Sequence, residues 1–425
     1  MKFSIFLGFL LIFVTFLPLV LVILEIFESQ NPASIIDFSH LECQKMFDGD
    51  PVSLARGALF KFDDREILAQ ILKLSGQENA QCAEFQKIFG FFQEPTSQEE
   101  LEFPLAYGML VHGDFVQLSL LLSAIYQPQN QFCLAVDGNS SVEFIGLVRM
   151  LSRCYGNIQY FITDEIRWCG YEILTSVFQC VDYLAKLPSD WKYFQYLSGV
   201  DAPLKSNLEM IRILKALNGS FNAEILPFEF YRLNRKRPWS SPLPLYKTSL
   251  SATFSRKSAN FMVNSEKVLE QIDFLRGTTC ADESLWATIA GNPKVIKFSE
   301  LPMPGGFDAK AWIHKNYRRT RGKLGKYGEN QKIDNGYYVS RYQQYVNRAP
   351  VKCKGYYYRL SCVFGVYDLP NLINRHELVA HKLYFSYQPA AFMCLVENSR
   401  QKSMRTPQFD FSAEKYRYEN LENVP

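Results

Sequence analysis

The feature that most constrains the fold is an alternation of apolar runs and helical spacing that begins near residue 103. FPLAYGMLVHGD is a short apolar run closed by polar residues, FVQLSLLLSAIY has the spacing of a helix, and QFCLAVDGN is a second apolar run. Two strands joined by a helix in this way form a βαβ unit and predict a parallel sheet. The alternation continues as strand, helix and strand in NIQYFITDE, VFQCVDYLAKL and WKYFQYLSGVDAPLKS. The sequence therefore predicts an α/β fold with a mostly parallel central sheet.

Polar residues follow three of these predicted strands: His112, Asp137 and Asp201. In an open α/β sheet, ligands bind at the carboxyl ends of the strands. A single polar residue at such a place is more often only part of a turn. Because three occur together, they indicate a nucleotide site.

The first residues indicate a membrane anchor. From Phe3 to Leu24 the chain has 22 residues without a charge, which is enough to cross a bilayer and more than a typical signal peptide contains. Lys2 supplies the positive side chain on the short side, so the positive-inside rule predicts a cytosolic tip at 1–2, an anchor at 3–24 and a lumenal body after Glu25. A cleaved signal peptide is the alternative. It also places the body in a secretory compartment.

Composition agrees with a secretory compartment. Ten cysteines are expected in an oxidising lumen, and sequons for N-glycosylation occur at Asn139 and Asn218. A net charge of +3 over 425 residues argues against a nucleic-acid-binding protein. Residues 25–100 end in a polar, proline-marked stretch, so we expect a stem and leading helical segment there, a lumenal domain at 101–400 and a polar tail at 401–425.

Two adjacent carboxylates, Asp282 and Glu283, precede an apolar run in GTTCADESLWATIAG. The local pattern favours a helix that begins near Glu283 and is capped by Asp282. A positioned carboxylate can instead act as a general base. The local sequence leaves the choice between these roles open.

The stretch PFEFYRLNRKRPWSSPLPLYK is proline-rich, basic and aromatic, which predicts a surface loop. One interpretation is a solvated run of charge. The other is a substrate-binding lip, in which Tyr231 or Trp239 stacks on a sugar while Glu229 and Arg232 hydrogen-bond to its hydroxyls.

Two cations stand out nearer the carboxyl terminus. Arg359 precedes the strand-like LSCVFGV, and Lys382 is expected at the end of a helix that begins near Leu369 or Pro370. Each alone is most simply a surface charge.

Together these segments resemble a known family, the core-2/I-branching β-1,6-N-acetylglucosaminyltransferases, Golgi glycosyltransferases grouped with the peptide xylosyltransferases. The resemblance extends from about Phe103 to Glu397. It rests on five stretches in family order: FPLAYGMLVH, LLSAIYQPQNQFCLAVD, WKYFQYLSGVDAPLKSNLEMIRIL, ADESLWATIAG and RLSCVFGVYDLPNL with the later HKL.

The resemblance implies a GT-A-like Rossmann fold, a UDP-sugar donor and an inverting single-displacement reaction. It implies that Glu283 is the catalytic base and that Arg359 and Lys382 bind the UDP diphosphate. It also implies that His112 and Asp137 bind the uridine.

The family pattern of cysteines implies four disulfides in this chain: Cys43–Cys394, Cys82–Cys154, Cys133–Cys180 and Cys353–Cys362. Cys169 and Cys280 are left over. They form either a fifth bridge or two buried free thiols, because connectivity cannot be deduced from sequence.

We expect the reaction to need no metal ion. The one Asp-x-Asp triplet, at 48–50, lies far upstream of the first strand and is a typical turn. Near VDGNSS only Asp137 is available, and one carboxylate is a thin ligand set for a hard cation. Arg359 and Lys382 can supply two positive charges instead.

The expected function is transfer of N-acetylglucosamine from UDP-GlcNAc, in β-1,6 linkage, to an O-glycan by a type II Golgi membrane enzyme. The acceptor side departs from the family, because VSRYQQYVNRAPVKC has only tyrosines, Tyr342 and Tyr345, where a tryptophan is common. Alternatives are a related transferase with another UDP-sugar or acceptor, such as a xylosyltransferase, and an anchored glycan-binding protein without catalysis.

Overall fold

The computed structural model describes residues 36–233, 240–298, 301–320, 336–346, 351–405 and 411–417. The predicted tip and anchor at 1–24 and the side chain of Trp239 lie outside these residues. In the part of the chain that is described, no helix has the length and apolar character needed to span a membrane.

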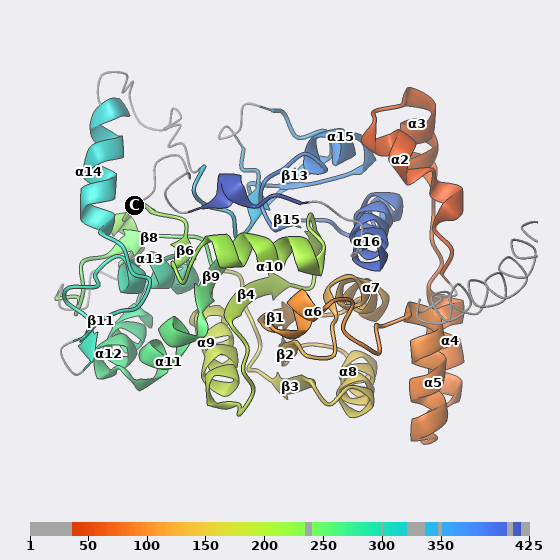
Figure 1. Ribbon diagram of the computed structural model, residues 1–425, viewed down its shortest axis with the longest axis horizontal. Helices are drawn as coiled ribbons and strands as arrows, with labels where there is room; N and C mark the ends of the chain where they lie inside the picture. Colours follow the sequence, from red (N-terminus) through yellow and green to blue (C-terminus); the bar gives the residue numbers. More distant parts are fainter. Residues whose placement is uncertain are drawn as a thin grey trace, which may run out of the picture.

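A six-stranded sheet forms the centre of the molecule, in the order β3-β2-β1-β4-β9-β6 (Figure 1). The first four strands pair in parallel, as predicted, and β9 pairs antiparallel with both β4 and β6. Nearly all of β1 is buried, which is typical of a parallel sheet covered on both faces. The strands are β1 (Leu105–Val111), β2 (Gln131–Val136), β3 (Ile158–Ile162), β4 (Tyr193–Ser198), β6 (Asn222–Ala223) and β9 (Ala252–Ser255).

Three of the helices between these strands, α7, α8 and α10, begin at side-chain caps, whereas α9 begins at Gly170 without one. Asp114 accepts the Gln117 N–H at the start of α7, and Ser206 forms a capping box with Glu209 at the start of α10. Helix α9 packs on β1 and β2, and α7 packs on α16. The predicted helices are confirmed as α7 (Phe115–Ile125) and α9 (Tyr171–Lys186), with α8 (Val142–Cys154), α10 (Asn207–Ala216) and α16 (Pro389–Met404) beside them.

In the segment expected to be a stem and leading helices, the described residues, from 36 onward, are largely helical. Its helices α4 and α5 lie at the opposite end of the molecule from α11, α12 and α14 (Figure 1). Gly49 has φ +84°, and Asp50 caps α3, so the Asp-Gly-Asp triplet is a turn, as predicted. The elements are η1 (Ser39–Leu41), α2 (Cys43–Phe47), α3 (Pro51–Leu59), α4 (Arg65–Lys73), α5 (Glu78–Phe89) and α6 (Gln98–Leu101).

A second, smaller sheet brings the carboxyl-terminal part of the chain beside β4. Its order is β12-β15-β5. The expected helix ending at Lys382 is wrong: α15 is short, and Lys382 follows the strand β15, which pairs with both of its neighbours. The elements are β5 (Asp201–Pro203), β12 (Tyr342–Gln343), β13 (Tyr356–Tyr358), β14 (Ser361–Val363), η5 (Val366–Asp368), α15 (Leu369–Leu372), β15 (Val379–His381) and η7 (Glu414–Tyr416).

The remaining elements include a short buried helix, α13, which packs against β8, α12 and η3. All six of its residues are buried, Trp286 packs 5.4 Å from Phe254 of β9, and its indole N–H donates to the Leu250 carbonyl. This packing fixes the residues just before α13. The elements are β7 (Leu226–Pro227), η2 (Phe230–Arg232), β8 (Tyr246–Lys247), α11 (Arg256–Asn264), α12 (Glu266–Leu275), η3 (Ala281–Glu283), α13 (Leu285–Ala290), β10 (Lys297–Phe298), β11 (Leu301–Pro302) and α14 (Ala309–Thr320).

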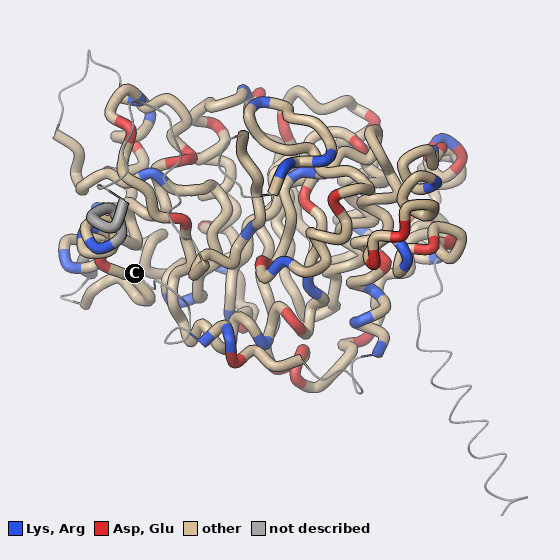
Figure 2. Tube along the Cα trace, turned by 90° about the horizontal axis from the view of Figure 1, so that it is seen from above, with Lys and Arg blue, Asp and Glu red and all other residues tan. Residues whose placement is uncertain are grey.

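Positive and negative residues are scattered along the described trace (Figure 2). This distribution fits the small net charge of +3. Local clusters of charge, rather than one charged face, therefore mark the candidate site.

Candidate active site

The two adjacent carboxylates have different environments. The expected cap at Asp282 is wrong, because α13 begins only at Leu285 and Asp282 makes no capping hydrogen bond. Its side chain is buried, and burial, then the neighbouring Glu283, raise the pKa of Asp282 to about 7. The Glu283 side chain is 29% exposed. Of these two carboxylates, only Glu283 is therefore accessible to a substrate.

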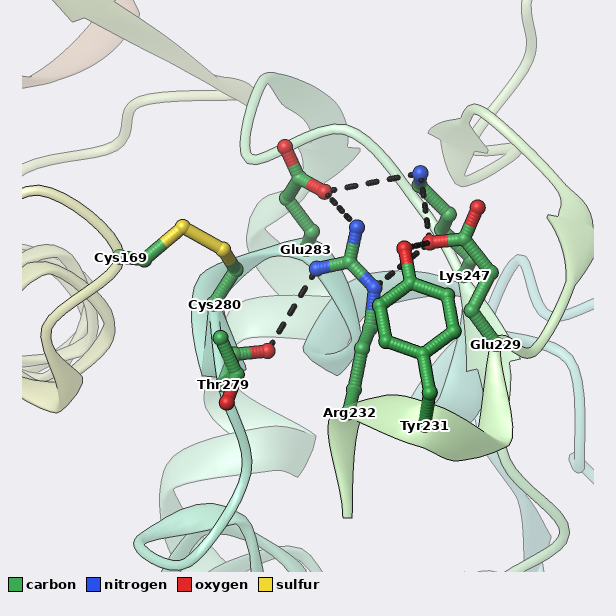
Figure 3. The surroundings of a disulfide bond; sticks show 8 residues. All are labelled: Cys169, Glu229, Tyr231, Arg232, Lys247, Thr279, Cys280 and Glu283. Atoms are coloured by element: carbon green, nitrogen blue, oxygen red, sulfur yellow. Dashed lines mark hydrogen bonds and ion pairs between the residues drawn. A yellow bond between two sulfur atoms is a disulfide. The ribbon is translucent and has the colours of Figure 1, made fainter.

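Glu283 belongs to a cluster of four charged side chains, Glu229, Arg232, Lys247 and Glu283, which we call the four-charge cluster (Figure 3). One Arg232 nitrogen, Nη2, donates to Glu283 Oε2 at 2.7 Å, and Nε donates to Glu229 Oε2 at 2.7 Å. Lys247 Nζ lies 3.0 Å from Glu229 Oε2 and 3.7 Å from Glu283 Oε2. Two carboxylates and two cations thus balance each other.

The electrostatics of Glu229 follow from these contacts. Burial alone would raise its pKa, but hydrogen bonds from Arg232 and Lys247 outweigh burial and lower the pKa of Glu229 to about 2. Tyr231 adds a hydrogen bond of 2.9 Å to the same carboxylate. Glu229 is therefore a fixed anion and a poor proton acceptor.

Main-chain contacts hold the four-charge cluster together. The carbonyl of Glu283 accepts the Thr248 N–H at 2.8 Å, and the carbonyl of Arg232 accepts the Thr279 N–H at 2.9 Å. These bonds join η3 and the residues just before it to Arg232, within the stretch predicted to form a substrate lip, and to Thr248, directly after that stretch. Tyr231 is 77% exposed, as a surface loop requires, whereas the Arg232 side chain is only 7% exposed.

Lys247 was not predicted as a site residue. In sequence it only closes a proline-rich stretch, and its charge is the single local signal. Its role becomes visible when β8 pairs with β7, since Lys247 lies opposite Leu226 and so comes beside Glu229.

His112 and Asp137 come together at the carboxyl ends of neighbouring strands, as the sheet predicts. His112 Nδ1 lies 3.6 Å from Asp137 Oδ2 and 3.2 Å from the Ser140 hydroxyl. The other carboxylate oxygen, Oδ1, accepts the N–H groups of Asn139 and Ile166 at 2.9 and 3.1 Å. His112 is exposed and Asp137 is buried, so Asp137 orients the surrounding loops while His112 faces solvent.

Asp201 forms no hydrogen bond or ion pair with His112 or Asp137 among the described residues, and its partners lie elsewhere. It is completely buried, accepts the Ser198 N–H at 2.7 Å and lies 2.7 Å from His381 Nδ1. The chain continues from β4 into β5 after a two-residue corner, so Asp201 fastens that corner to β15.

Arg359 and Lys382 form a second charged site, which we call the cation pair. Arg359 lies in the turn between β13 and β14, and Lys382 Nζ donates to the Tyr358 carbonyl at 3.1 Å. Both cations contact the Tyr358 ring, at 5.5 Å for Arg359 and 4.8 Å for Lys382. Burial, then the charges of Arg359 and Arg341, lower the pKa of Lys382 to about 8. The described residues offer neither cation a carboxylate partner, so the cation pair suits an anion.

The structure contains five disulfides. Four are the pairs implied by the resemblance, Cys43–Cys394, Cys82–Cys154, Cys133–Cys180 and Cys353–Cys362. The fifth joins Cys169 to Cys280, whose Cα atoms are 3.9 Å apart, so the alternative of two free thiols is wrong. Two of the bridges, Cys43–Cys394 and Cys82–Cys154, attach the leading helices to the body.

One group of residues in the described chain has the spacing of a metal site, namely Cys353, Cys362 and Asp368. Its two sulfurs are bonded to each other, so they are not available as thiolate ligands. The asparagines of the two sequons, Asn139 and Asn218, are exposed.

Comparison with known proteins identifies the class of protein that this fold and site define. The family model described as "Core-2/I-Branching enzyme" matches residues 105–323, which extend from β1 past Glu283 and the four-charge cluster. The chain belongs to this family. The mixed α/β fold with its mostly parallel sheet fits a GT-A-like domain, and the cation pair lies beyond the matched residues.

Curated relatives give the chemistry of the class. A human protein named β-1,3-galactosyl-O-glycosyl-glycoprotein β-1,6-N-acetylglucosaminyltransferase is 28% identical over 407 residues, which cover 89% of this chain and 88% of the relative. The enzyme of the same name numbered 3, from Rattus norvegicus, is 28% identical over 347 residues, covering 76% and 74%. The protein is accordingly an enzyme of the glycosyltransferase class.

Proposed function

We propose that this protein is an inverting glycosyltransferase that transfers N-acetylglucosamine from UDP-GlcNAc, in β-1,6 linkage, to an O-glycan. The names of the relatives support the reaction class and the kind of acceptor. The observation that carries the proposal is the environment of Glu283, one carboxylate placed by a buried helix at the edge of a charge-balanced cluster.

Glu283 is the proposed catalytic base. Its Oε2 is occupied by Arg232, whereas Oε1 makes no hydrogen bond to any described residue and points away from the cluster (Figure 3). In the reaction Oε1 takes the proton of the acceptor 6-hydroxyl, the hydroxyl oxygen bonds to the donor C1, and the bond from C1 to the UDP oxygen breaks. Inversion requires this base on the face opposite the leaving group.

The cation pair is the proposed site of the UDP diphosphate. Departure of UDP leaves negative charge on phosphate oxygens, and cations already in place stabilise that charge in the transition state. Arg359 offers a planar fork of donors and Lys382 a point charge. His112 and Asp137, which follow β1 and β2, are the proposed uridine-binding residues.

The four-charge cluster is the proposed acceptor side. Glu229 and Arg232 present polar groups beside the base, and the exposed ring of Tyr231 can stack on a sugar face. We also propose a type II Golgi membrane topology, with glycans on Asn139 and Asn218. The apolar run at 3–24 and the five disulfides support that location.

The test uses the full chain in detergent. UDP release is measured with UDP-GlcNAc, UDP-glucose, UDP-galactose and UDP-xylose, each with and without β-1,3-galactosyl-N-acetylgalactosamine and a serine-containing peptide. Release from UDP-GlcNAc that depends on the disaccharide, with a β-1,6 product by NMR, supports the proposal. Release from UDP-xylose with the peptide would identify a xylosyltransferase. Disaccharide binding without release from any donor would identify a glycan-binding protein.

A further inference from the structure

The loop after β3, residues 163–170, contacts three parts of the site, and we call it the post-β3 loop. Its first contact is with the end of β2 and with Asp137, the residue that follows β2. The Thr163 N–H donates to the Val136 carbonyl at 2.8 Å, and the Ile166 N–H donates to Asp137 Oδ1 at 3.1 Å. A Cβ on Gly138 would lie 2.3 Å from the Thr163 carbonyl oxygen, so the loop packs closely against the end of β2.

The second contact is with the cation pair. The Arg359 guanidinium lies 5.3 Å from the centre of the Trp168 ring, within the range of a cation–π interaction. Trp168 is 64% exposed, so it is held at the surface by this contact rather than by a core.

The third contact is the Cys169–Cys280 disulfide, which joins the post-β3 loop to the segment that carries Glu283 (Figure 3). The Cys280 N–H also donates to the Cys169 carbonyl at 3.2 Å. Cys169 and Cys280 have φ of 61° and 52°, a region that residues other than glycine rarely adopt. Both backbones therefore depend on their surroundings for this conformation, and the bridge is the covalent part of those surroundings.

We propose that the Cys169–Cys280 disulfide positions the catalytic base relative to the diphosphate cations. The covalent path from Glu283 runs through Cys280 and Cys169 to Trp168, which contacts Arg359. The bridge thus sets the separation between the group that takes the acceptor proton and the group that stabilises the leaving UDP. This inference rests on the proposed function. Cys169, Cys280 and Trp168 act here as positioning residues.

The test compares two variants that each lose one bridge. Cys169→Ser with Cys280→Ser removes the positioning disulfide, and Cys82→Ser with Cys154→Ser removes a bridge between α5 and α8, two helices that carry none of the proposed site residues. Both double variants should unfold at a lower midpoint temperature than the wild type, because each loses a disulfide. Only the first should lower kcat, by roughly ten-fold or more, while KM for the acceptor stays within about two-fold, because a misplaced base slows the chemical step. Equal kcat in the two variants would overturn the proposal.

A further variant, Trp168→Ala, keeps the Cys169–Cys280 disulfide. It tests the contact between the post-β3 loop and Arg359 even if the double cysteine variant does not fold. Loss of the cation–π contact should weaken UDP binding by about two- to five-fold, measured by calorimetry, and Trp168→Phe should restore most of it. Unchanged UDP affinity in Trp168→Ala would contradict the proposed path. The UDP measurement requires no turnover, so an inactive wild type would overturn the proposed function alone.

Discussion

The two charged regions of the site differ in their balance of charge. The four-charge cluster pairs two carboxylates with two cations, and every member has an oppositely charged partner within 3.0 Å. The cation pair places Arg359 and Lys382 around one tyrosine ring without a carboxylate partner in the described chain. The charges of the four-charge cluster balance one another, whereas the two positive charges of the cation pair are balanced only when an anion is bound.

This difference matches the two substrates of the proposed reaction. A sugar acceptor is neutral and needs hydrogen bonds and one proton acceptor, which the four-charge cluster supplies. A nucleotide sugar carries a diphosphate, whose charge the cation pair can neutralise. Variants in the two regions should therefore separate catalysis from donor binding.

The largest effect is expected for Glu283→Gln. The amide keeps the shape of the side chain and an oxygen for Arg232, but it cannot take a proton. We expect kcat to fall by about 10² to 10⁴-fold, the usual contribution of a general base, while UDP affinity by calorimetry stays the same.

Glu229→Gln is the matched control, since Glu229 shares Arg232 and Lys247 with Glu283. Its low pKa makes it unsuited to proton transfer, so its loss of kcat should be smaller. Equal losses of kcat in both variants would contradict the assignment of the base.

A smaller effect, on binding, is expected for Arg359→Ala and Lys382→Ala. Each removes a charge-assisted hydrogen bond to phosphate, worth about 1.5–3 kcal/mol, so UDP affinity should fall by roughly 10- to 150-fold. Arg149→Ala, an exposed arginine on α8, is the control. UDP affinity that was unchanged in both variants, but lost in Arg232→Ala, would reverse the roles of the two regions.

Sequence predicted the parallel part of the sheet well because β1, β2 and β4 are nearly continuous buried runs between polar ends, while the half-exposed edge strand β3 still follows the alternation of strands and helices. The strand-end residues His112 and Asp137 followed directly from that pattern. Lys382 was misplaced because the three-residue strand β15 is too short for periodicity, and it forms only by pairing with β5 and β12.

The four-charge cluster was only partly predictable. Glu229 and Arg232 are close in sequence, but Lys247 and Glu283 reach them only through the pairing of β7 with β8 and the position of η3. The different environments of Asp282 and Glu283 depend on burial, which two adjacent acidic letters do not reveal. Cys169 and Cys280 likewise left two alternatives until the fold brought them together.

A smaller effect is expected from pH, which should change UDP affinity through the charge of Lys382 in the cation pair. Burial and then Arg359 lower the pKa of Lys382 to about 8, so the free enzyme loses this charge as pH rises through that value. UDP affinity should therefore fall between pH 7 and pH 9, by up to about ten-fold. Lys382→Arg remains charged throughout this range and should bind UDP with a flatter profile.

Measurement of both proteins side by side corrects for the ionisation of UDP itself. Lys186→Arg, at an exposed lysine of α9, should follow the wild-type profile. Parallel profiles for wild type and Lys382→Arg would show that Lys382 does not carry the charge that UDP meets.

The smallest expected effect is that of chelation. Arg359 and Lys382 supply the same formal charge as one divalent ion, so the diphosphate needs no metal for neutralisation. Asp137, the carboxylate nearest the expected metal position, uses Oδ1 to accept two backbone N–H groups and lies beside His112 with Oδ2, so it already organises the loops. We expect the rate of transfer in EDTA to equal the rate in Mn²⁺ or Mg²⁺ within about two-fold.

A matched assay with Arg359→Ala distinguishes charge supplied by the cation pair from charge supplied by a metal ion, because added Mn²⁺ should not rescue that variant. Wild-type activity that disappeared in EDTA and returned with Mn²⁺ would show that the cation pair alone does not neutralise the diphosphate, and the contrast between the two regions would then have to include a metal ion.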